Sequence, residues 1–115
     1  MNISPKANRL ARWEKQYARR RQQLAQLGYL SQGSVVARRP PASPPYQWTR
    51  KEKAKTVSVA LSKAQFNWLK EAVANQRRLS RIIQQMQKLS RQILFATVPG
   101  VSRRKRLSRK VLGLI

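Results

Sequence analysis

The sequence contains no cysteine and no histidine, and it holds only three acidic residues among 115. Without cysteine there is neither a disulfide nor a thiolate for catalysis or structural zinc. Without histidine there is no imidazole base, and Glu14, Glu52 and Glu71 fall in separate segments, so carboxylates do not cluster for metal-ion or phosphoryl-transfer chemistry. The four glycines form no phosphate-binding loop. We therefore expect a non-enzymatic protein that takes no metal, no cofactor and no small-molecule substrate.

Long apolar runs are also missing from the sequence. No stretch approaches the roughly 18 consecutive apolar residues that a membrane-spanning helix needs. The N-terminus has no apolar stretch of the kind found in a signal peptide. We expect a cytoplasmic protein, associated with the bacterial nucleoid if it binds DNA.

Positive charge is what the sequence has in excess. Twenty-six lysines and arginines against three acids give a net charge of +23 at pH 7. Self-repulsion at this density destabilises a compact chain unless a polyanion neutralises it. A phosphate backbone does so while releasing its condensed counterions. The charge therefore predicts a nucleic-acid-binding protein, with an anionic membrane surface or an acidic protein as the alternatives.

Two segments have helical periodicity. In residues 6–28 apolar side chains recur every three or four positions, and only Arg20 interrupts the pattern. The members of this stripe are Leu10, Trp13, Tyr17, Leu24 and Leu27. Pro5 suits the start of such a helix and Gly28 suits its end.

Residues 63–96 predict a longer helix. Ser62 and Gln65 have the spacing of a capping box at its start. Its seam follows a heptad pattern through Trp68, Ala72, Asn75, Leu79, Ile82, Met86, Leu89 and Ile93. We expect this seam to pack the protein's own helices. A homodimer or a partner helix is the alternative, in which Asn75 would set the register.

Between the helices the period changes to two, which predicts strands at 35–39, 46–50 and 55–61. The proline-rich residues 40–45 form a loop, and Lys51 to Lys55 connect the last two strands as a hairpin whose turn type is left open. The fold class is therefore α+β: an N-terminal helix, a small antiparallel hairpin or three-stranded sheet, and a long C-terminal helix. The helices are expected to pack as an antiparallel pair in a single domain of residues 1–100, followed by a flexible basic tail at 101–115.

Alternation along the strands indicates which side chains point outward. Tyr46 and Trp48 should pack against a helix, although stacking on unpaired bases is an alternative role for them. The opposite face is polar, and a small sheet of this kind can enter the DNA major groove while flanking cations hold phosphates. Ordinary solvated residues on an exposed sheet are the other interpretation. The predicted nucleic-acid-binding residues are Arg38, Arg39, Gln47, Thr49, Arg50, Lys51, Lys53, Lys55, Arg103, Arg104, Lys105 and Arg106.

The middle of the chain resembles a family of small bacterial proteins that are often found with transposable elements. The residues that carry the resemblance are Gly33-Ser34-Val35-Val36, Pro45-Tyr46-Gln47-Trp48, Lys55-Thr56 and Leu61, which match a GS…PYxW…KT…L pattern. The chain resembles a cysteine-free variant of the family, because residues 38–45 stand in place of the family's Cys-rich loop and Gln47 replaces the second tyrosine of its Pro-Tyr-Tyr motif. The resemblance implies a mobile-DNA context. In outline, a three-stranded sheet followed by a helix is also similar to the arm-type DNA-binding modules of some phage integrases.

Together these features predict a DNA-binding accessory protein linked to a transposon or integrase. The first alternative is an RNA-binding protein of the ribosomal type, since small size and a basic tail are common there. The second is a membrane-surface or helix-partner protein, because the tail ends in the apolar residues 111–115. DNA is favoured over RNA as the partner.

Overall fold

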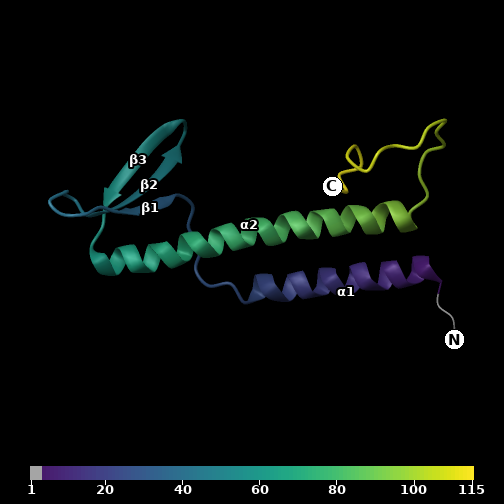
Figure 1. The fold of residues 1–115 in the computed structure, drawn as a ribbon, viewed down its shortest axis with the longest axis horizontal. Helices are drawn as coiled ribbons and strands as arrows, with labels where there is room; N and C mark the ends of the chain where they lie inside the picture. Colours follow the sequence, from purple (N-terminus) through teal and green to yellow (C-terminus); the bar gives the residue numbers. More distant parts are fainter. Residues whose placement is uncertain (1–3) are drawn as a thin grey trace. The chain divides into compact units, whose positions relative to one another are not determined.

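The computed structural model describes residues 4–115. Its elements follow one another as α1, β1, β2, β3 and α2, which confirms the α+β class and the helix–sheet–helix order (Figure 1). Their bounds are Pro5–Ala25, Ser34–Ala37, Tyr46–Glu52, Lys55–Ala60 and Lys63–Thr97.

The chain forms two compact units. One combines the residues up to Gln26 with Arg81–Ile115, and we call it the helical unit. The other is Leu27–Ser80, and we call it the sheet unit. The first part of α2 therefore belongs to the sheet unit and the remainder to the helical unit.

Side-chain caps determine where the two helices begin. Gln65 donates its backbone N–H to Ser62 Oγ at 3.1 Å, and Ser62 donates its own to Gln65 Oε1 at 2.9 Å, so the predicted capping box is confirmed. Ser4 Oγ accepts the N–H of Ala7 at 3.1 Å in front of Pro5. At its other end α1 stops at Ala25, before the expected Gly28. Gly28 instead lies where an added Cβ would come within 3.2 Å of Asn75 Nδ2.

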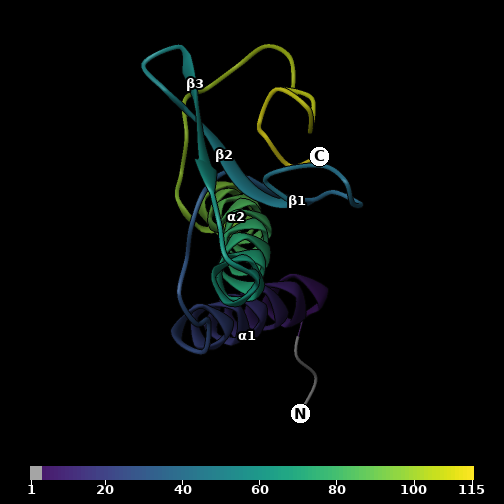
Figure 2. The same ribbon diagram turned by 90° about the vertical axis from the view of Figure 1, so that its left-hand side faces the viewer.

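The sheet is antiparallel, with β2 between β1 and β3. Ser34 pairs with Thr49 and Thr49 with Ser58, so these three residues form one row across the sheet. Figure 2 shows the β2–β3 hairpin rising from the first turns of α2. The three expected strands are present, but β1 starts one residue earlier and ends two residues earlier than expected, β2 extends to Glu52, and β3 ends one residue earlier, at Ala60.

The hairpin turn is tighter than the expected five-residue connection. Only Lys53 and Ala54 lie between the strands, with φ angles of +47° and +65°. Two central residues with positive φ are the mark of a type I′ turn, whose twist matches that of the flanking strands. The turn lacks the Asn-Gly pair that usually announces this geometry, so the sequence did not indicate its type.

In the sheet unit, the segment before β1 is fastened to α2. Ser31 donates its N–H to Ala72 O at 3.2 Å, and Asn75 Nδ2 donates to Tyr29 O at 3.1 Å. Asn75 is buried and also accepts from Arg78 Nη1 at 3.0 Å. Both functional ends of the Asn75 amide are thus engaged within one chain. This differs from the alternative in which Asn75 sets the register of a coiled coil.

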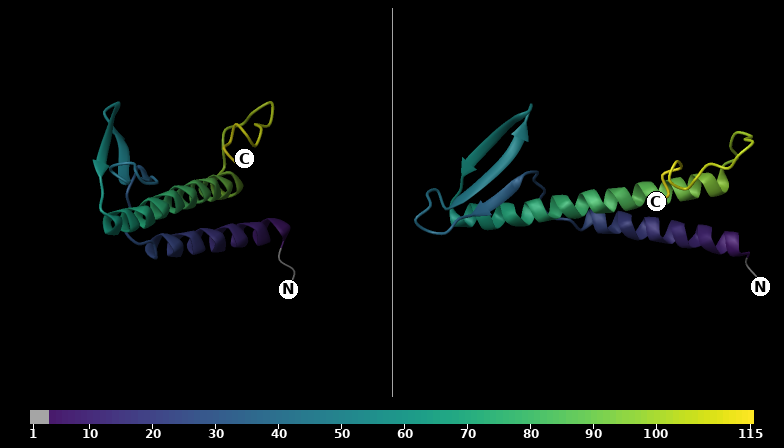
Figure 3. Two further views of the ribbon diagram at one scale, coloured as in Figure 1. Left: turned by 60° about the vertical axis from the view of Figure 1, so that its left-hand side comes forward. Right: turned by 45° about the horizontal axis from the view of Figure 1, so that its top comes forward.

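In the helical unit, α1 lies antiparallel beside the C-terminal part of α2 (Figure 3). Trp13 and Arg20 of α1 line one hollow together with Leu89 of α2, and Leu89 is buried. The residues of the α1 stripe are all half-buried, including the polar interruption at Arg20. The packing is therefore shallow, as the short chain leads one to expect.

The last residues of the chain contact α2. Leu114 is buried, and Arg91 Nε of α2 donates to Gly113 O at 2.7 Å. The predicted tail from 101 to 115 therefore includes residues that pack on the helical unit. The apolar residues 111–115 are the basis of the membrane-surface alternative, and Leu114 among them packs inside the protein.

Candidate nucleic-acid interface

Strand register places a continuous polar surface on one face of the sheet. Three rows cross it: Val36 with Gln47 and Ala60, Ser34 with Thr49 and Ser58, and Lys51 with Thr56. We call this surface the polar sheet face. Its members on β3 are exposed, and those on the central strand β2 are half-buried between their neighbours, apart from the exposed Lys51.

Hydrogen bonds between side chains order the polar sheet face. The hydroxyls of Thr49 and Ser58 lie 3.3 Å apart across β2 and β3. Arg38, just beyond β1, donates its guanidinium to the Gln47 side chain. These two contacts join four hydrogen-bonding groups in pairs at the surface.

The opposite face of the sheet packs within the sheet unit. The ring of Tyr46 lies 5.0 Å from that of Phe66 in α2, measured between ring centroids. Trp48 Nε1 donates to Gln32 O at 3.0 Å. Tyr46 thus faces α2 as expected, whereas Trp48 bonds to the segment before β1.

Arg50 lies on this packed face and not on the polar sheet face. Its guanidinium carbon sits 4.4 Å from the centroid of the Trp48 ring, and its Nε is 3.4 Å from Glu52 Oε1. Between residues 4 and 115 this is the only ion pair. Of the predicted binding residues, Arg50 is therefore the one whose charge is paired with a carboxylate.

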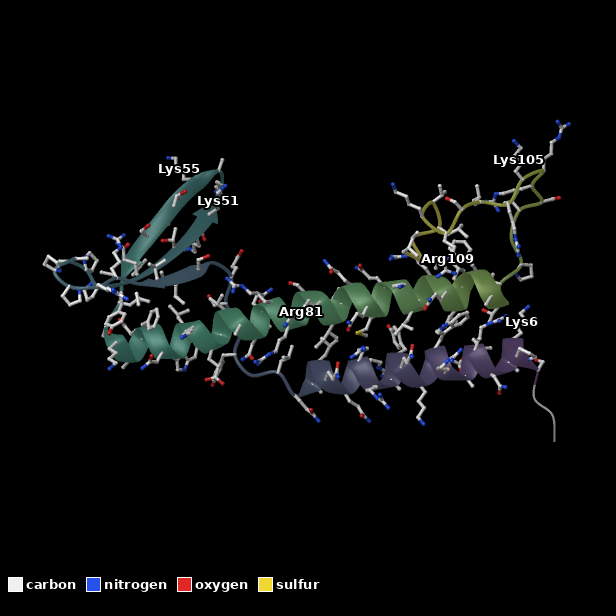
Figure 4. The ribbon with its side chains drawn as sticks, viewed as in Figure 1. Lys6, Lys51, Lys55, Arg81, Lys105 and Arg109 are labelled. Carbon is white, nitrogen blue, oxygen red and sulfur yellow. The ribbon has the colours of Figure 1, made fainter. Side chains whose placement is uncertain are left out.

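Lysines gather at the tip of the hairpin. Lys51 ends the polar sheet face, Lys53 is in the turn, and Lys55 begins β3 opposite Glu52. Figure 4 shows Lys51 and Lys55 at the same far end of the hairpin. Arg38 and Arg39 follow β1 at the other end of the sheet, so the cations flank the polar sheet face at both ends.

The remaining predicted residues, Arg103 to Arg106, belong to the helical unit. All four are exposed. They therefore make up a separate candidate surface within that unit.

Sequence reasoning missed Ser34 and Val36 on the polar sheet face. The sequence held a signal for them, because side chains alternate along a strand and Ser34 and Val36 therefore point to the face opposite that of Val35. The polar sheet face holds one amide, four hydroxyls and one lysine beside Val36 and Ala60, so it can hydrogen-bond and attract anions. Residues 4–115 contain no group of three His, Cys, Asp or Glu side chains that could bind a metal. Within the same range, no helix has both the length and the apolar character needed to cross a membrane.

Comparison of the chain with protein-family models, curated proteins and solved structures finds no match. The resemblance to a transposon-associated family therefore stays a prediction.

Proposed function

We propose that this protein binds duplex DNA without catalysing a reaction, and that the polar sheet face enters the major groove. The observation that carries the proposal is the arrangement of the sheet unit. Amide and hydroxyl groups in two neighbouring rows of the polar sheet face are flanked by cations at both ends, while Tyr46 on the other face packs on α2. This arrangement offers base-edge contacts at the centre and phosphate contacts at the ends.

The dimensions of the sheet suit the major groove. Neighbouring strands lie about 4.8 Å apart, so three strands span roughly 10 Å from β1 to β3. The major groove of B-DNA is about 12 Å wide. Gln47 can pair with the edge of adenine, and hydroxyls such as those of Thr49 and Ser58 can contact any base.

The same geometry favours DNA over RNA. The major groove of A-form RNA is deep and narrow, and side chains cannot read it. RNA binding of the ribosomal type is the second candidate function, supported by the charge of the chain. A transposon or integrase context, proposed from the sequence resemblance, would make the protein an accessory to recombination at the nucleoid.

A salt titration tests the phosphate contacts. Changing Lys51, Lys53 and Lys55 to Gln should reduce the slope of log affinity against log salt by about 0.9 for each phosphate that these lysines no longer neutralise. The matched control changes Arg12, Lys15 and Arg19 of α1, which removes the same charge from exposed positions in the helical unit. Fluorescence anisotropy with a labelled blunt DNA duplex measures both slopes. Equal slopes in the two triple variants would remove the hairpin from the interface.

A single carboxylate tests the polar sheet face itself. Ser58→Glu places a negative charge in the middle row and should weaken duplex binding by about tenfold or more. Ser80→Glu, also exposed but on α2, is the control with the same charge change. Protein that binds neither duplex DNA nor duplex RNA in low-salt buffer would overturn the proposed function as a whole.

A further inference from the structure

Two neighbouring hollows lie beneath the tail in the helical unit. The larger, about 550 Å³, is bounded by α1, the C-terminal part of α2 and the tail. The smaller, about 400 Å³, lies between the end of α2 and residues 100–107. Phe95, Arg106, Leu107 and Leu112 line both of them, so we treat the two as one site and call it the tail cleft.

The floor of the tail cleft is aromatic and aliphatic. Trp13 of α1 and Phe95 of α2 contribute their rings to the larger hollow, beside Leu107 and Leu112. Phe95 lines both hollows and remains 48 % exposed. Flat rings exposed inside a basic groove are the feature on which single-stranded nucleic-acid-binding proteins stack bases.

The rim of the tail cleft is cationic. Arg9, Arg106 and Arg109 line the larger hollow, and Arg103 and Lys105 join Arg106 around the smaller one. Among residues 4–115, no acidic side chain lines either hollow. Guanidinium groups bind phosphate oxygens with two parallel hydrogen bonds, so this rim has the chemistry of a phosphate site.

The tail is held in the shape that forms the cleft. Leu114 donates its N–H to Arg109 O at 2.8 Å, and Val111 donates to Ser108 Oγ at 3.2 Å. Arg91 Nε fastens Gly113 O to α2 at 2.7 Å. Figure 4 shows Arg109 close to α2, with Lys105 on the outer part of the tail. These contacts hold the inner part of the tail, which carries Arg109, against α2.

We propose that the tail cleft binds unpaired nucleotides of a nucleic-acid strand. Their bases stack on Trp13 and Phe95, and Arg106 and its neighbours hold the phosphates. The two hollows fall within the range of about 300–1,000 Å³ that is usual for ligand sites. An acidic peptide would also satisfy the cations, but the flat aromatic floor favours a nucleobase. The inference rests on the proposed function, and it assigns the helical unit a different form of nucleic acid from the duplex at the polar sheet face.

Two alanine variants test the aromatic floor in the full-length protein. Phe95→Ala should weaken binding of a labelled oligo-dT strand by about fivefold to 150-fold, the effect of removing the stacking partner of one base. Leu94→Ala is the matched control, because Leu94 is the adjacent residue, is 45 % exposed and lines neither hollow. Both variants should bind a blunt duplex as the unaltered protein does. Circular dichroism confirms that each keeps its helix content.

Two glutamine variants test the cationic rim. Arg106→Gln should lower the salt slope for oligo-dT by about 0.7, the value for one phosphate contact on a single strand. Lys110→Gln removes the same charge from an exposed position of the tail that lines neither hollow, so its slope should stay close to that of the unaltered protein. Equal effects of the two changes would show a diffuse basic arm and overturn the cleft.

The outcomes separate this inference from the proposed function. If the protein binds duplex DNA but Phe95→Ala leaves oligo-dT binding unchanged, the proposed role of the tail cleft is wrong, while the proposed role of the polar sheet face stands. Ser58→Glu should lose duplex binding and retain oligo-dT binding, because the two surfaces are expected to act independently. Poly-glutamate tests the acidic-protein alternative. If poly-glutamate binds tightly, and if Phe95→Ala weakens its binding but not that of oligo-dT, the cleft is a site for an acidic protein and the inference is overturned.

Discussion

The positive φ angles of the hairpin turn predict that replacing Ala54 by glycine raises the free energy of unfolding, whereas replacing Ala60 by glycine lowers it. Ala54 has a φ of +65°, a conformation that costs a residue with a Cβ about 1–2 kcal/mol. Glycine adopts this conformation freely but loses about 0.5–1 kcal/mol in chain entropy on folding. Ala54→Gly should therefore stabilise the sheet unit by about 1 kcal/mol, the difference of these two effects.

Ala60 provides the control, because it lies in β3 of the same hairpin and has no positive φ. Ala60→Gly gains no relief and should destabilise the sheet unit by about 0.5–1 kcal/mol. Urea unfolding followed by tryptophan fluorescence measures both changes. A Trp13→Phe background restricts the signal to Trp48 and Trp68, which both belong to the sheet unit.

The comparison of the two alanines is decisive. If Ala54→Gly lowers the free energy of unfolding as Ala60→Gly does, the turn is not of the I′ type. The lysines at the tip would then be displayed by a different turn. Because Ala54→Gly removes no charge, duplex affinity should stay unchanged at moderate salt. A large loss of affinity would also contradict the assigned geometry.

Three further substitutions follow from contacts in the two units. Asn75→Ala removes a buried donor to Tyr29 O and should destabilise the sheet unit by about 1–3 kcal/mol in urea unfolding; a change below about 0.5 kcal/mol would contradict that contact. Gly113→Ala puts a Cβ 2.5 Å from Arg91 Nε at a φ of +72°, so limited proteolysis should cleave the tail faster than in the unaltered protein, and unchanged cleavage would argue against the packed end. Gly33→Ala brings a Cβ within 2.6 Å of Thr49 O at a φ of +105° and should lower the thermal midpoint of the sheet unit, which circular dichroism can follow; an unchanged midpoint would count against the close approach of β1 and β2.

The elements could be predicted because local signals agree with the final structure. The capping box at Ser62 and the period-two strands depend on neighbours within a few residues, and both are confirmed. The polar sheet face followed from alternation, which separated Gln47 and Thr49 from Tyr46 and Trp48. Arg50 was included among the predicted binding residues because of its charge, and the face of the strand on which it lies was not taken into account. Alternation had already placed it with the aromatics, where it now contacts Trp48.

The parts that could not be predicted depend on contacts between distant segments. Asn75 resembled a coiled-coil residue because its partner, Tyr29 O, lies 46 residues away in the sequence. The tail cleft has the same origin, since Arg9, Phe95 and Arg109 come from three separate segments. The heptad seam likewise showed that α2 packs, without showing that Trp68 would stack on Tyr29 and stay 54 % exposed.

The fastening of residues 28–33 to α2 has a consequence for the order of folding. The hairpin closes over a two-residue turn, whereas the Asn75–Tyr29 bond closes a loop of 46 residues at a larger cost in closure entropy. β1 follows this segment directly, so the edge strand should dock last and open first. Amide hydrogen exchange in β1 should then be faster than in β2 and β3. β1 would then be the least protected strand of the sheet. The polar sheet face would reach its full width of three strands only when β1 is docked.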